Sequence, residues 1–87
     1  MTDDIQTVDD GDDVIAAFEV LKAATPPRFM ADFGRMMLMY RKGSVHCFKH
    51  KDMRRSFGFD VATGEFSGIG DEGEITTVEE AYEWARS

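Results

Sequence analysis

The sequence predicts an α+β fold in which an N-terminal and a C-terminal helix pack on one face of a small antiparallel sheet of three to four strands. Two segments with apolar residues at helical spacing flank a central stretch in which apolar and polar residues alternate. Glycine-containing turns divide this stretch into short segments, as in consecutive β-hairpins. The predicted element order is α-β-β-β-(β)-α.

The 87 residues suffice for one domain with a small core. A chain of this length buries roughly 60% of the surface that its unfolded form exposes. Besides Met1, residues 1–11 contain four acids and only two sizeable apolar side chains, Ile5 and Val8, so burial cannot offset the entropy lost on ordering them. We therefore predict a flexible acidic tail over residues 1–11 and a single α+β domain over residues 12–87.

The first helix is predicted to begin at Asp12 or Asp13, because either side chain can cap the first turn. It ends before residues 26–27, where two prolines remove amide donors and push the residues ahead of them out of the helical region. The helix in between has about three turns and carries an apolar stripe at i, i+4 and i+7. The main members of this stripe are Val14, Phe18 and Leu21.

The state of residues 29–39 is open between strand and helix. Between Met36 and Tyr40 the chain is apolar on both alternating faces, which is typical of a strand covered on both sides. Methionine and leucine also favour a helix, so a short helix is the alternative. Gly43 then supplies the positive φ that closes a three-residue turn, which predicts a hairpin into residues 44–48.

Beyond residues 51–52, apolar and polar residues alternate, which predicts a half-buried strand. Its apolar face holds Met53, Phe57, Phe59 and Val61, with Arg55 as an exception, and its polar face holds Arg54, Ser56, Gly58 and Asp60. A second glycine turn over residues 62–64 leads to a short strand over residues 65–69. A glycine-rich acidic loop follows over residues 68–74.

The last helix is predicted to follow Thr76 or Thr77, because threonine with glutamate three residues later forms a capping box. Glu79 and Glu80 in its first turn also suit the positive end of the helix dipole. Trp84 is predicted at the edge of the core. The buried stripe of this helix comprises Val78, Ala81, Tyr82 and Ala85.

Charge is segregated along the chain, whose net charge is −7. Residues 1–27 contain seven acids against Lys22 alone, a balance of −6. Residues 28–55 contain eight basic residues against two acids, a balance of +6. Residues 56–87 contain eight acids against Arg86, a balance of −7. Such segregation favours a protein with a charged contact surface.

No catalytic or cofactor motif stands out, so we predict a protein that is not an enzyme and binds no cofactor. A single cysteine, Cys47, excludes an intrachain disulfide and fits a reducing, cytoplasmic setting. The acidic N-terminus lacks the features of a signal peptide, and no apolar run approaches the ~18 residues of a membrane span. We expect no membrane association, and either a monomer or a homodimer paired through residues 36–39.

Three residues of zinc-ligating type, His46, Cys47 and His50, lie close together in the sequence. In a strand, Cys47 points away from both histidines, and four steps of ~3.3 Å separate the two histidines by ~13 Å. This distance is too long for a shared ion. The segment therefore predicts no metal site unless it is helical.

The acidic balance and the lack of catalytic groups favour a small acidic regulator or inhibitor that binds a protein partner with a cationic surface. Such a protein can imitate the charge of nucleic acid, in analogy to phage-encoded antagonists of host machinery. The predicted contact face consists of acids in the tail, the start of the first helix and the exposed side of the last helix. These residues are Asp9, Asp10, Asp12, Asp13, Glu79, Glu80 and Glu83.

The alternative is a nucleic-acid-binding module built on the basic segment 41–55. Aromatic rings and histidines interleave with its cations, a mixture that pairs phosphate charge with base stacking. The competing structural explanation is that these cations neutralise the acidic helices within the fold. The six cations are Arg41, Lys42, Lys49, Lys51, Arg54 and Arg55, and the interleaved rings are Tyr40, His46, Phe48 and His50.

The order helix, three strands, helix resembles the double-stranded-RNA-binding domain, and the run GIGDEGEITTVEEA lies where that family has a glycine-rich approach to its last helix. The resemblance concerns topology. That family places lysines at the start of the last helix to hold phosphates, whereas this chain has Glu79 and Glu80. The resemblance therefore does not imply RNA binding by this helix.

Overall fold

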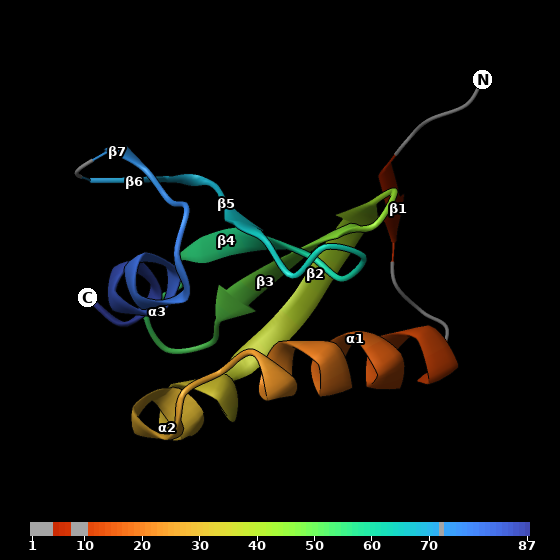
Figure 1. The fold of residues 1–87 in the computed structure, drawn as a ribbon, viewed down its shortest axis with the longest axis horizontal. Helices are drawn as coiled ribbons and strands as arrows, with labels where there is room; N and C mark the ends of the chain where they lie inside the picture. Colours follow the sequence, from red (N-terminus) through yellow and green to blue (C-terminus); the bar gives the residue numbers. More distant parts are fainter. Residues whose placement is uncertain (1–4, 8–10, 72) are drawn as a thin grey trace.

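A computed structural model describes residues 5–7, 11–71 and 73–87, with side chains from Val14 onward. It confirms the predicted α+β class, with helices and antiparallel sheet in one small domain (Figure 1). The elements in chain order are β1 (Ile5–Thr7), α1 (Gly11–Ala23), a 3₁₀ turn (Pro27–Phe29), α2 (Met30–Phe33), β2 (Met36–Lys42), β3 (Val45–His50), β4 (Ser56–Asp60), β5 (Phe66–Ser67), β6 (Ile69–Gly70), β7 (Gly73–Glu74) and α3 (Val78–Arg86).

The main sheet is antiparallel with the strand order β1-β2-β3-β4-β5, and β6 and β7 form a separate small hairpin. Phe48 on β3 is the register partner of Phe57 on β4, so both rings lie on the same face of the sheet. The α1 residue Phe18 packs on Phe48 at 5.2 Å between ring centroids, and the α3 residue Tyr82 packs on Phe57 at 5.5 Å. The first and last helices therefore cover one face, as predicted.

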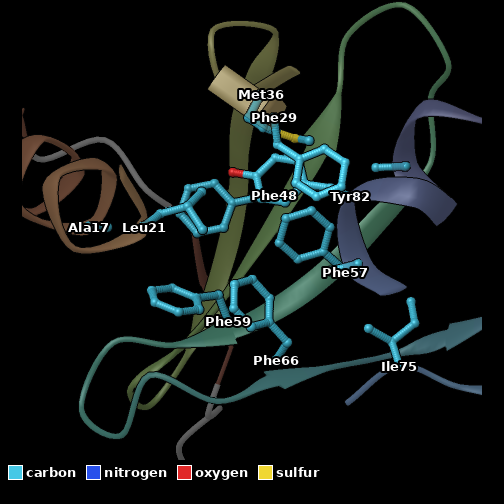
Figure 2. Close-up of a cluster of buried hydrophobic side chains, with 12 residues drawn as sticks. Ala17, Leu21, Phe29, Met36, Phe48, Phe57, Phe59, Phe66, Ile75 and Tyr82 are labelled. Carbon is cyan, nitrogen blue, oxygen red and sulfur yellow. The ribbon is translucent and has the colours of Figure 1, made fainter. Parts of the chain in front are cut away.

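The core between the helices and the sheet is rich in aromatic rings (Figure 2). The closest ring pair joins β4 to β5, where the ring centroids of Phe59 and Phe66 lie 4.8 Å apart. The predicted stripe of α3 faces this core, with Ala81, Tyr82 and Ala85 fully buried. The buried residues are Ala17, Leu21, Phe29, Met36, Phe48, Phe57, Phe59, Phe66, Ile75, Ala81, Tyr82 and Ala85.

The predicted acidic tail differs from the structure over Ile5–Thr7. These residues form the edge strand β1, which pairs with Tyr40–Lys42 of β2. Side-chain burial alone does not predict this strand, because an edge strand is held by backbone hydrogen bonds to its neighbour. Residues 1–4 and 8–10 of the predicted tail lie outside the described residues.

Residues 29–39, for which strand and helix were the two alternatives, contain both. The chain is helical up to Phe33 and then forms β2 from Met36. The expectation that this strand is covered on both faces is wrong, because Met37, Met39 and Tyr40 are exposed. A register shift between Leu38 and Tyr40 lets Met39 stand outside the regular pairing, as a β-bulge does.

Both predicted glycine turns are present, with positive φ at Gly43 (63°) and Gly64 (79°). The first turn is shorter than predicted, because Lys42 pairs directly with Val45 and leaves two residues in the loop. A positive φ at the first of two loop residues is the pattern of a type II′ hairpin. Two further details differ from prediction. Met53 is exposed in a turn, and part of the acidic loop forms the β6–β7 hairpin.

The last helix begins with the predicted capping box. Thr77 is the N-cap, its hydroxyl accepts a hydrogen bond from the Glu80 amide at 3.1 Å, and the Glu80 carboxylate accepts from the Thr77 amide at 3.1 Å. The same carboxylate accepts from the Thr76 amide at 2.8 Å. These bonds lower the pKa of Glu80 below its ordinary value. They also fix the first turn of α3 against the preceding loop.

Replacing Thr77 with alanine is expected to lower the free energy of unfolding by about 1 kcal/mol, because the Glu80 amide loses the hydroxyl that accepts its hydrogen bond, whereas the Thr77 amide keeps the Glu80 carboxylate. A lowered pKa at Glu80 means that its stabilising contribution is present at neutral pH and is lost as the pH falls through the folded-state pKa. Urea unfolding at pH 7 and pH 3 measures both effects. An unchanged urea midpoint in T77A at pH 7 would contradict the assigned cap.

Candidate functional site

A groove of about 330 Å³ separates the β6–β7 hairpin from α3. We call it the carboxylate groove, because acidic side chains dominate its rim while the Trp84 indole and Ile75 supply apolar surface. Its lining residues are Gly70, Asp71, Gly73, Glu74, Ile75, Glu80, Glu83, Trp84 and Ser87. Residues from the acidic loop and from the last helix are thereby combined in one surface.

The Trp84 indole is held in place from several sides. Its Nε1 donates a hydrogen bond to the Ser56 carbonyl at 3.0 Å. The Arg55 guanidinium lies 4.8 Å from the ring centroid, a cation–π arrangement. Gly70 packs against the ring so closely that a Cβ there would stand 3.3 Å from an indole carbon. The apolar side of the groove is therefore a fixed aromatic surface.

Three carboxylates of the groove have no partner within the described part of the chain: Asp71, Glu74 and Glu83. Other acids are engaged in the fold. Glu79 forms an ion pair with Arg28 at 3.3 Å, and Glu80 caps α3. The free carboxylates thus concentrate negative charge beside Trp84. None of the three forms an ion pair with another described residue of the chain.

The predicted acidic face is placed only in part. Asp9 and Asp10 lie outside the described residues, and Asp12 and Asp13 lie in α1 without described side chains. Among the predicted residues of α3, only Glu83 is a free member of the groove. Asp71 and Glu74 were not predicted to belong to a contact face, and Trp84 was predicted only at the edge of the core. The signal was the run GDEGE immediately before the last helix.

The basic segment divides into engaged and free cations. Arg55 stacks on Trp84 and donates a hydrogen bond to the Ser87 carbonyl, and Arg41 is half-buried with an interaction of its own. Neither proposed explanation covers all six cations, since two are engaged within the fold and the partners of Arg55 are an aromatic ring and a carbonyl rather than the carboxylates of an acidic helix. The cations without an ion pair to any described residue are Lys42, Lys49, Lys51 and Arg54.

Most of the rings proposed for base stacking belong to the core. Phe48 is fully buried, and His46 and His50 are 5% and 4% exposed. Tyr40 is the exception, because 42% of its surface is accessible. Of the interleaved rings, only Tyr40 is available to a ligand.

The two histidines have structural partners. His46 Nδ1 lies 2.9 Å from the Ser44 carbonyl, to which it donates. His50 Nδ1 accepts hydrogen bonds from the amides of Asp52 and Met53, and its Nε2 donates to Asp32 at 3.3 Å. Cys47 lies on the opposite face of β3, as expected for a strand. The described residues contain no cluster that could hold a metal ion.

Comparison with models of protein families, with curated proteins and with solved structures finds no match for this chain. Among the described residues, no helix is both long and apolar enough to cross a membrane.

Proposed function

We propose that this protein is a small non-enzymatic regulator or inhibitor that binds a protein partner through its carboxylate groove. The observation that carries the proposal is the set of free carboxylates, Asp71, Glu74 and Glu83, gathered around the fixed Trp84 indole. Carboxylates that contribute to no internal ion pair leave their charge available to a partner.

The groove matches the chemistry of an arginine or lysine side chain. The methylene stem of such a residue can lie against the part of the Trp84 indole that lines the groove and is not covered by Arg55 or Gly70, while its charged head reaches the carboxylates of Glu74 and Glu83. Ion pairs at an aromatic surface that excludes water are stronger than exposed pairs. The partner surface is therefore cationic.

The net charge of −7 extends this preference beyond the groove. A cationic protein surface that normally holds nucleic-acid phosphates also accepts carboxylates, since arginine binds both groups in the same bidentate geometry. Imitation of nucleic-acid charge is therefore part of the proposal. Under it, DNA or RNA competes with this protein for the partner.

The test compares two double variants of equal charge. Glu74→Gln with Glu83→Gln removes two carboxylates of the groove, whereas Glu19→Gln with Glu65→Gln removes two exposed carboxylates elsewhere. Each immobilised protein is exposed to an extract of its source cells, and bound proteins are identified and then titrated as purified partners. We expect the groove variant to bind the partner at least about tenfold more weakly than the control, because each lost charge-assisted hydrogen bond costs about 1.5–3 kcal/mol.

Competition and salt complete this test. The retained partner is expected to be released by added DNA and by a few hundred millimolar salt. Equal retention by the groove variant and its control would contradict the assignment to this groove. Retention that neither salt nor DNA weakens would contradict the proposed charge imitation.

A further inference from the structure

The second surface with unused charge is the face of the main sheet that points away from the helices, here called the open face. The burial alternation of β3 places Val45, Cys47 and Lys49 on it, opposite the buried residues His46, Phe48 and His50. The strand register adds residues of β2, since Tyr40 pairs with Cys47, Lys42 with Val45 and Met37 with Lys49.

A groove of about 550 Å³ crosses the open face. Tyr40 stands at one side of it and Ile69, whose surface is 72% exposed, at the other. Small residues keep the middle hollow, and at Gly58 a Cβ would come within 2.6 Å of the Ser67 hydroxyl. The lining residues are Tyr40, Lys42, Val45, Cys47, Ser56, Phe57, Gly58, Ser67, Gly68 and Ile69.

Two free cations flank the exposed ring. Lys42 and Lys49 lie on either side of Tyr40 along the β2–β3 pair, and neither forms an ion pair with a described residue. Lys42 on β2 pairs with Val45 on β3, and Lys49 lies four residues after Val45 on the same strand. The two lysines are therefore separated along the strands by about four residue steps, or ~13 Å. At ~3.4 Å for each stacked nucleotide, this distance matches about four nucleotides of a single strand.

The neighbouring thiol favours a neutral tyrosine. Hydrogen bonding to Cys47 and charge repulsion from it raise the pKa of Tyr40 above its ordinary value. Since a tyrosine with an ordinary pKa is already uncharged at neutral pH, this shift only adds to that margin, and the ring does not repel a phosphate. An exposed aromatic ring beside a groove, with a lysine on each side, is the arrangement with which sheet surfaces bind single strands.

We propose that the open face binds a short single-stranded nucleic acid, with a base stacked on Tyr40 and phosphates held by Lys42 and Lys49. This site is distinct from the carboxylate groove and does not depend on it. An acidic peptide offers the two lysines the same charge, but it lacks the planar base that suits Tyr40. The net charge of −7 opposes the approach of a polyanion, so binding is weak and confined to low salt.

The probe is a fluorescein-labelled oligothymidine of eight nucleotides, titrated by anisotropy over a salt series. Lys42→Gln with Lys49→Gln is expected to weaken binding at least tenfold and to reduce the log–log salt slope by about 1.4, since each single-strand phosphate contact contributes about 0.7. Tyr40→Ala is expected to weaken it at least about fivefold through lost stacking. The matched control, Lys22→Gln with Arg28→Gln, carries the same charge change at two exposed positions outside the groove lining and is expected to stay within about threefold of the parent.

Neutralising the acids of the N-terminal segment provides an independent test of the proposed nucleic-acid site. Removing residues 1–11 would also remove β1, so Asp3, Asp4, Asp9 and Asp10 are changed to asparagine instead. We expect this variant to bind the oligonucleotide more tightly, because repulsion between the chain and phosphate decreases.

Three results would overturn the proposal. The first is no binding of the oligonucleotide at 20 mM salt, and the second is equal weakening by the variant Lys42→Gln with Lys49→Gln and by the control Lys22→Gln with Arg28→Gln. The third is displacement by an octaglutamate peptide as effective as displacement by unlabelled oligothymidine, which would assign the open face to acidic protein segments. The variant of the carboxylate groove, Glu74→Gln with Glu83→Gln, is expected to bind the oligonucleotide as the parent does. Failure of the proposed nucleic-acid site is therefore distinguishable from failure of the proposed protein-binding groove.

Discussion

Replacing Tyr82 with alanine is expected to lower the free energy of unfolding by about 3–5 kcal/mol, a large part of the stability of a domain of this size. Tyr82 is fully buried and stacks on Phe29, with 5.1 Å between ring centroids and 11° between ring planes. It also contacts Phe57 across the interface between α3 and the sheet. Loss of the ring leaves a cavity where the connection after α1, α3 and β4 meet.

The Tyr82 hydroxyl contributes separately from the ring. It lies 2.8 Å from the Thr25 hydroxyl, which itself lies 2.7 Å from the Leu21 carbonyl and donates to it. Tyr82 is therefore the donor to Thr25. Tyr82→Phe keeps the ring and loses one buried hydrogen bond, so we expect a loss of about 1 kcal/mol. Urea unfolding of both variants is the measurement, and equal midpoints for Y82A and Y82F would contradict this division.

Alkaline pH provides a second readout for Tyr82. Burial raises its pKa from 10.0 to about 12. A group whose folded-state pKa is raised contributes stability that is complete below the unfolded-state pKa and is lost as the pH rises toward the folded-state value. Between pH 10 and 12 the free energy of unfolding is expected to fall by up to about 1.4 kcal/mol per pH unit through this residue. Y82F should lack this part of the decline.

Replacing His50 with leucine is expected to cost about 2–4 kcal/mol, because it removes the partners of three polar groups. The imidazole Nδ1 accepts from the amides of Asp52 and Met53 at 3.2 and 3.3 Å, which fixes the turn after β3. Its Nε2 donates to Asp32, whose other oxygen lies 3.4 Å from the Arg86 guanidinium. His50 thus ties this turn to α2 and to the last helix.

Amide side chains separate the two roles of His50. Asparagine places an oxygen near the position of Nδ1, and glutamine places a nitrogen near that of Nε2. Asp32 keeps Arg86 as a partner in either case, whereas the two turn amides depend on Nδ1. We therefore expect His50→Asn to retain more stability than His50→Gln. Equal stability of the leucine, asparagine and glutamine variants, measured by urea unfolding, would contradict these roles.

The sequence predicted elements whose determinants are local. Gly43 and Gly64 close turns that need a positive φ, and Thr77 caps a helix with Glu80 three residues later. Helix α3 follows directly from such local signals and from its apolar spacing. The strand β1 was missed, because it is held by backbone bonds to Tyr40–Lys42, more than thirty residues away.

The candidate site was less predictable, because the availability of a charge depends on distant partners. Arg28 and Glu79 are 51 residues apart in sequence, and no local pattern shows that they pair. Likewise, Asp71 and Glu74 line the same groove as Glu83 because Gly70 allows the hairpin to pack closely on Trp84. Composition reveals that the chain is acidic, whereas the fold determines which acids remain free.

The most direct measurement of the carboxylate groove is an amide-resolved NMR titration of the full chain with an octa-arginine peptide. We expect the shift changes to concentrate in residues 70–75 and 83–87 and in the Trp84 indole N–H, and to vanish in the variant carrying Glu74→Gln and Glu83→Gln. Shift changes spread evenly over all exposed acids, with Glu19 and Glu65 affected as strongly as Glu83, would contradict a specific cation-binding groove. In that case the free carboxylates would contribute only general negative charge.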